Sequence, residues 1–86
     1  MTLEIINTIM GSIEPGLDGV IRSLGGPPEG VSSKNIRFAY MEVHQTISVT
    51  VTFSKDKCLQ MCYAFSGELL AATMVGPKSI KPLSLE

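Results

Sequence analysis

The sequence contains no tryptophan, one histidine and two cysteines, and only 17% of its 86 residues are charged. Seven Lys and Arg residues against eight Asp and Glu residues give a formal net charge of −1, so the overall charge provides no attraction to nucleic acid or to an anionic membrane. A hydrophobic content of 44% argues against disorder. With so few ionic groups to cover the surface, we expect part of the apolar surface to pack against a partner.

The two cysteines, Cys58 and Cys62, lie in a segment that reads as a strand. On a strand they would share one face about 13 Å apart, beyond the reach of a disulfide, so we expect free thiols and a reducing compartment. Glu4 precedes the first basic residue, Arg22, so the apolar start does not resemble a secretory signal. No uncharged apolar run approaches the roughly 18 to 20 residues of a membrane-spanning helix. These features predict a cytoplasmic protein without a membrane interaction.

Few residues could carry out catalysis. His44 is the only histidine and is expected at an exposed hairpin turn, where no general-base pair is specified. A zinc site would need His44, Cys58 and Cys62 to converge from distant ends of two strands. Neither thiol has a histidine or a cation specified beside it. We therefore expect no enzymatic activity, no metal and no cofactor.

In residues 1–24 the apolar residues recur every three or four positions, which is typical of one apolar face of a helix. The positions are Ile6, Ile9, Met10, Ile13, Leu17, Val20, Ile21 and Leu24. Pro15 and Gly16 interrupt the pattern, which favours two short helices with a break between residues 12 and 15; one kinked helix is the alternative. Residues 25–34, with paired glycines and prolines, predict a helix stop followed by a loop.

From residue 35 to residue 75 the apolar period becomes two, as in antiparallel strands. A turn at His44 and Gln45 that pairs Val43 with Thr46 would place Tyr40 opposite Val49. A three-residue loop at residues 55–57 would then pair the next two strands and place apolar side chains opposite one another. The pairs expected from that loop are Ser54 with Cys58, Phe53 with Leu59, Val51 with Met61, Val49 with Tyr63 and Ile47 with Phe65.

The pattern of residues 68–86 is less decisive. Residues 68–75 fit either a fourth strand or a short helix capped by Ser66, and the strand is favoured. Residues 76–86 contain two prolines and predict an extended tail. Residues 1–86 are thus expected to form one small α+β domain, with the helical segment packed on a three- to four-stranded antiparallel meander. The expected core combines the helical stripe with Ile36, Phe38, Tyr40, Ile47, Val49, Val51, Phe53, Leu59, Met61, Tyr63 and Phe65.

The opposite side of the predicted sheet is nearly free of charge, with Arg37 at its margin. Exposed sheet faces usually carry Lys, Glu and Arg, so we expect this face to be an interface of a homo-oligomer. The alternative is a threonine-rich face exposed to water. The expected interface residues are Ala39, Met41, Val43, Ser48, Thr50, Thr52, Gln60, Cys62 and Ala64. The leading hypothesis is therefore a non-enzymatic interaction protein, such as an inhibitor, an adaptor or an assembly subunit.

A second hypothesis is a ligand-binding oligomer that holds an anionic or nucleotide-like molecule between its subunits. Gly25 and Gly30 have the spacing of phosphate-loop glycines, but Val31 occupies the position of the lysine and the loop follows a helix. Cations and hydroxyl groups around this loop could still bind an anion. The candidate ligand residues are Arg22, Ser32, Ser33, Lys34 and Arg37.

Overall fold

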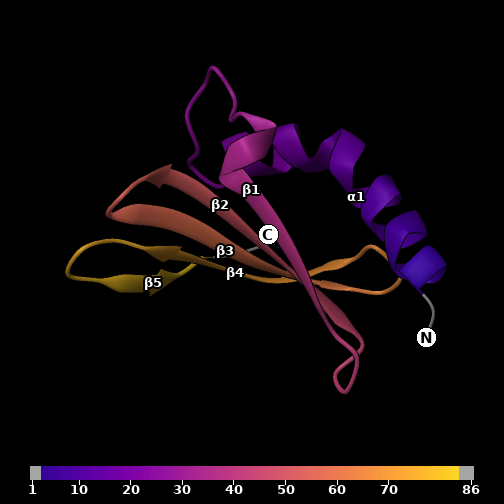
Figure 1. Cartoon of the computed structure of the whole chain (residues 1–86). Helices are drawn as coiled ribbons and strands as arrows, with labels where there is room; N and C mark the ends of the chain where they lie inside the picture. Colours follow the sequence, from indigo (N-terminus) through magenta and orange to yellow (C-terminus); the bar gives the residue numbers. More distant parts are fainter. Residues whose placement is uncertain (1–2, 84–86) are drawn as a thin grey trace.

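A computed structural model describes residues 3–83 and contains one α-helix, one short 3-10 helix and five strands. Helix α1 spans Leu3–Ser23 and the 3-10 helix η1 spans Ser33–Asn35. The strands are β1 (Ile36–Met41), β2 (Thr46–Ser54), β3 (Lys57–Ala64), β4 (Leu69–Val75) and β5 (Ile80–Pro82). They form one antiparallel sheet in the order β1-β2-β3-β4-β5, with α1 lying across one side of it (Figure 1). The α+β prediction is confirmed, but the sheet has five strands and not three or four.

The apolar stripe of α1 faces the sheet and forms the core with it. Ile13, Leu17 and Ile21 are buried on the helix. Their partners on the sheet are Ile47, Val49, Val51, Leu59, Met61, Tyr63 and Ala72. Complete burial of an aliphatic side chain of this kind stabilises the folded state by about 1.5–3 kcal/mol. This contact fixes α1 to one face, which we call the inner face, and no other element among residues 3–83 covers the opposite face.

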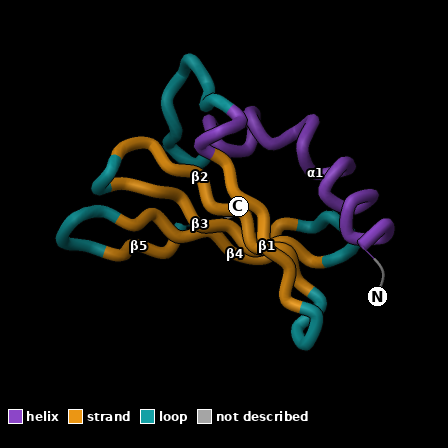
Figure 2. Tube along the Cα trace, in the orientation of Figure 1, coloured by secondary structure: helices purple, strands orange, loops and turns teal. Residues whose placement is uncertain are grey.

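Helix α1 is a single helix, so the predicted break between residues 12 and 15 is wrong. Pro15 lies inside it, where a proline normally costs about 3 kcal/mol. Ile13 and Leu17 flank Pro15 and are both buried against the same sheet. Their burial offsets the lost backbone hydrogen bond and keeps both halves of α1 in helical conformation. The axis of the helix bends as it crosses the sheet (Figure 2).

The pairing of β1 with β2 differs by two residues from the predicted register. Tyr40 lies opposite Ile47, and Phe38 lies opposite Val49. The chain turns over four residues, 42–45, with Gln45 at φ 52°. A two-residue turn at His44 and Gln45 would need positive φ values that suit Gly, Asn or Asp better. Because the shift is an even number of residues, each side chain stays on its predicted face.

The pairing of β2 with β3 also differs by two residues from the prediction. Val51 lies opposite Leu59, and Val49 lies opposite Met61. The connection is a two-residue turn, Lys55 and Asp56, and the register shifts between Thr52 and Ser54. Neither turn residue has a positive φ. An irregularity of this kind adds local twist, which lets such a turn connect two strongly twisted strands.

The segment after Gly67 is a strand, as favoured from the sequence. Residues 76–86 were expected as an extended tail, but residues 80–82 form β5 against β4. The Leu83 amide donates a 2.9 Å hydrogen bond to the Ala72 carbonyl oxygen, which continues this pairing. The part of the tail at residues 84–86 lies outside the described residues.

Most of the expected core is confirmed, with one exception. Tyr40 lies on the inner side of an edge strand and is 49% exposed, so it does not belong to the core. Ile36, Phe38, Phe53 and Phe65 are half-buried and pack against the core. Ala72 is buried and was missed, because its strand could not be assigned to a face without its register.

Candidate functional site

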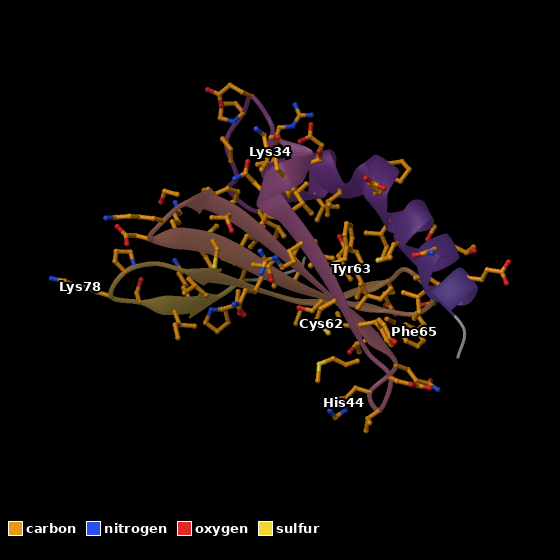
Figure 3. All side chains as sticks on the ribbon, viewed as in Figure 1. Lys34, His44, Cys62, Tyr63, Phe65 and Lys78 are labelled. Carbon is orange, nitrogen blue, oxygen red and sulfur yellow. The ribbon has the colours of Figure 1, made fainter. Side chains whose placement is uncertain are left out.

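The side of the sheet turned away from α1 is the main candidate for a functional surface. We call it the outer face and define it by the residues that the strand registers place on that side. These are Arg37, Ala39, Met41, Thr46, Ser48, Thr50, Thr52, Cys58, Gln60, Cys62, Ala64, Ala71, Thr73, Val75, Ile80 and Pro82. Figure 3 shows the two sides directly: Tyr63 lies between the sheet and α1, whereas Cys62 points away from α1.

No element described between residues 3 and 83 covers the outer face. None of its residues is buried, and Met41 and Ile80 are 51% and 73% exposed. Arg37 is its only charged residue. On the inner side, by contrast, the exposed surface of α1 carries Glu4, Glu14, Asp18 and Arg22. The molecule therefore concentrates its charge away from the outer face.

A shallow hollow of about 270 Å³ lies on the outer face. Ser48, Cys62 and Ala71 come from three adjacent strands and pair directly with one another across the sheet. Their short side chains leave the surface low at this point. The residues lining the hollow are Met41, Thr46, Ser48, Gln60, Met61, Cys62, Ala71 and Thr73. All of the lining residues except Met41 therefore belong to β2, β3 and β4.

Eight of the nine expected interface residues lie on the outer face. The exception is Val43, which belongs to the turn between β1 and β2 and is 91% exposed. The predicted turn at His44 and Gln45 would leave Val43 on the strand, whereas the observed turn begins one residue before Val43. His44 lies in the same turn, where it is exposed at the tip of the hairpin (Figure 3).

Both cysteines are free and half-buried on the outer face. They lie four residue steps apart on an extended strand, which corresponds to about 13 Å. Cys62 lines the hollow described above. Cys58 is the second residue of β3 and lies opposite Thr52. The prediction of two free thiols is confirmed.

The five candidate ligand residues are not brought into one group. The Arg22 guanidinium donates to the Asp18 carboxylate at 3.0 Å, and both side chains are about half exposed. Ser32 and Ser33 line a hollow of about 440 Å³ together with Glu14, Asp18 and Glu29. Lys34 and Arg37 line a different hollow, of about 300 Å³. The structure therefore separates the serines, which lie among carboxylates, from two of the three cations.

Tyr63 carries a phenol whose pKa is raised by its surroundings. Its side chain is buried between the sheet and α1, and this burial raises the pKa of the phenol above its usual value of 10.0. The cause is the loss of solvation of the phenolate in an apolar surrounding. The shift reflects the packing of the core, because Tyr63 lines none of the hollows described above.

Comparison of the chain with protein-family models, with curated proteins and with solved structures gave no match. In the described part of the chain, no group of three or more His, Cys, Asp or Glu residues is placed to hold a metal ion. Between residues 3 and 83 there is also no helix with the length and apolar character required to cross a bilayer. The function must therefore be argued from the surfaces of this fold.

Several residues of the outer face were missed from the sequence. Ala71, Thr73 and Val75 alternate along β4, and Ile80 and Pro82 alternate along β5. The sequence shows that these residues alternate along the chain. Which face of the sheet they occupy depends on how β4 pairs with β3 and how β5 pairs with β4. Asn35 was missed for a similar reason, since only the structure shows that it lines the same hollow as Lys34 and Arg37.

Proposed function

We propose that this protein is a non-enzymatic interaction protein that works as a homo-oligomer, with the outer face of one copy packed on the outer face of another. The observation that carries the proposal is the near absence of charge on this uncovered face, where Arg37 stands alone. A sheet face that remains in water is normally rich in Lys, Glu and Arg. An inhibitor, an adaptor or an assembly subunit would each use such a surface.

The size of the outer face supports this role. Five strands at about 4.8 Å spacing extend about 19 Å from the first axis to the last. Strands β1 to β4 have six to nine residues and are about 20–30 Å long, whereas β5 has three residues. The face therefore has a flat area of roughly 400–500 Å². The side chains roughen it, so its accessible area is larger than this flat value, which is itself at least half of the roughly 800 Å² per partner in a standard interface.

A second copy of the chain is the partner that fits the face best. In a two-fold symmetric pair, each patch meets the same patch of its partner, so a patch of one charge would repel itself. The outer face avoids this repulsion because it is almost uncharged. It also carries exposed apolar side chains, Met41 and Ile80, together with a hollow of about 270 Å³ that a side chain of the second copy can enter. Two such sheets can pack face to face at about 10 Å separation.

The remaining parts of the proposal have separate support. His44 is exposed in the turn between β1 and β2, and the residues that define the outer face include no His, Asp or Glu, which supports a non-enzymatic role for this face. The two thiols are too far apart for a bridge within the chain, which suits a reducing compartment, and we propose a cytoplasmic location on that basis.

The proposal is tested by the oligomeric state and its response to one buried charge. Gln60 is exposed at the middle of β3, and Gln60→Lys keeps the length of the side chain while adding a charge at the centre of the face. Asn7→Lys adds the same charge on the exposed side of α1 and serves as the matched control. Native mass spectrometry and light scattering over a concentration series should show an oligomer for the wild type and for Asn7→Lys.

Gln60→Lys should weaken assembly by at least about tenfold, because the interface would bury an unpaired ammonium group. Circular dichroism of the dilute monomers should be unchanged, which separates loss of assembly from loss of folding. A wild-type protein that stays monomeric at micromolar concentration would remove the proposal. An oligomer that both variants preserve would show that assembly uses another surface.

A further inference from the structure

A second surface feature lies at the corner where η1 meets the first two strands. It is a hollow of about 300 Å³ lined by Lys34, Asn35, Arg37, Thr50 and Thr52. Lys34 and Asn35 come from η1, and Arg37 and Thr50 are direct register partners on β1 and β2. Thr52 follows on the same face of β2. Residues from three elements therefore converge on one concavity, which the sequence pattern alone did not show.

The lining of this hollow has a consistent chemistry. It combines a lysine and an arginine with one amide and two hydroxyl groups, and it contains no carboxylate and no aromatic side chain. Within residues 3–83, neither Lys34 nor Arg37 has an acidic partner; the recorded salt bridge joins Arg22 to Asp18. Two cations without a counter-charge in one hollow favour the binding of an anion.

The neighbouring hollow provides an internal contrast. It is lined by Glu14, Asp18 and Glu29 and so disfavours anions. Ser32 and Ser33 line that acidic hollow, whereas the next residue, Lys34, lines the basic one. The short helix η1 thus begins where the acidic surface ends and carries Lys34 toward Arg37. This separation of charge is what distinguishes the basic hollow from an even scatter of surface lysines.

We propose that this hollow binds a phosphate group, with Arg37 and Lys34 supplying charge and Asn35, Thr50 and Thr52 supplying neutral hydrogen-bond donors. A guanidinium can donate two parallel hydrogen bonds to a phosphate, and hydroxyl and amide donors can satisfy the remaining oxygens. The volume lies at the lower end of the range for ligand sites. With no aromatic side chain to stack on a base, the site suits inorganic phosphate or a small phosphate monoester better than a nucleotide.

The site is compatible with the proposed assembly but does not depend on it. All five lining residues belong to one chain. The hollow lies at the β1 corner of the outer face, so it would form part of the polar rim of an interface centred on Ser48 and Cys62. A phosphate bound there would also neutralise Arg37, the one charge that assembly brings close to a partner.

The experiment is a titration of the full chain with inorganic phosphate and with glycerol 3-phosphate, followed by amide chemical shifts at constant ionic strength. Saturable shifts should appear at residues 34–37 and 50–52. Arg37→Gln should weaken binding by about tenfold, and Thr50→Val should weaken it by a smaller factor with the fold retained. Lys78→Gln, which removes an exposed cation from the turn between β4 and β5, is the matched control and should bind as the wild type does.

Tighter binding of the ester than of phosphate would identify an ester as the ligand, and equal binding would identify free phosphate; both results support the site. The proposal is overturned if neither compound gives saturable shifts at millimolar concentration. It is also overturned if Lys78→Gln loses as much affinity as Arg37→Gln, because binding would then be a general effect of charge. Amide shifts report on the hollow whether the protein is monomeric or assembled, so this result is independent of the oligomeric state.

Discussion

The amide of Gly26 donates a 2.9 Å hydrogen bond to the carbonyl oxygen of Ile21, and this contact ends α1. One residue earlier, the Gly25 amide donates to the Arg22 carbonyl oxygen at 3.2 Å, with Gly25 at φ 98°. These two bonds form the glycine-dependent helix end known as a Schellman motif. The motif directs the chain from α1 into the loop that leads to η1 and the basic hollow.

Substitution of these glycines should destabilise the fold to different extents. Gly25→Ala forces a side chain into a left-handed conformation and should lower the free energy of unfolding by about 1 kcal/mol. Gly26→Ala should cost more, because its Cβ would lie 2.8 Å from the Ile21 carbonyl oxygen. Gly16→Ala is the matched control: it lies inside α1 with nothing within 4 Å of a Cβ, and it should stabilise the protein by about 0.5–1 kcal/mol. Urea unfolding measures all three, and equal effects at residues 16, 25 and 26 would contradict this account.

Burial of Tyr63 should make stability depend on alkaline pH. Because the pKa of the phenol is raised in the folded state, folding favours the neutral form. The resulting stability is fully present below the unfolded pKa of about 10 and is lost as the pH rises through the folded pKa. Absorbance titration of a Tyr40→Phe variant isolates Tyr63 and should give a midpoint above 10.0. Tyr63→Phe should flatten the alkaline part of the stability curve; an unchanged curve would argue against burial as the cause.

The thiol of Cys62 should report on assembly. It lines the hollow at the centre of the outer face, so a second copy would cover it. In a Cys58→Ser variant, Cys62 is the only thiol, and its rate of maleimide labelling should fall as the protein concentration rises through the assembly range. The matched comparison adds Gln60→Lys to the same background, where labelling should remain fast at every concentration. Labelling that stays equally fast while the protein is oligomeric would place the interface elsewhere.

The two register errors share one cause, which is that local patterns define the faces of a strand better than they define its alignment with a neighbour. Alternation along β2 and β3 correctly assigned Val49 and Met61 to the inner face. Their opposition was missed because the registers depend on the turns, and the turns are set by the φ value of Gln45 and by the irregularity after Thr52. An error of two residues leaves each face intact, so the charge-poor outer face was recognised although its pairs were not.

The site was predicted less well than the fold. The interface residues were found because a strand's alternation is a local property. The ligand residues, by contrast, were grouped by nearness in the sequence, and Arg22, Ser33 and Lys34 lie in three different surroundings in the structure. No local pattern could show that Thr50 and Thr52 lie beside Lys34, because the contact joins η1 to the middle of β2.

The sequence by itself determined the α+β class, the apolar stripe of α1, the glycine end of that helix and the low charge of one sheet face. These features depend on periodicity and on the conformations open to single residues. Tertiary structure decided that α1 continues through Pro15, that residues 80–82 add a fifth strand, and that Lys34 meets Arg37 in one hollow. Each of these outcomes depends on contacts between different elements: α1 packs on the sheet, β5 pairs with β4, and η1 meets β1 and β2 at one hollow. In the first two, the free energy of burial and strand pairing exceeds the local preference.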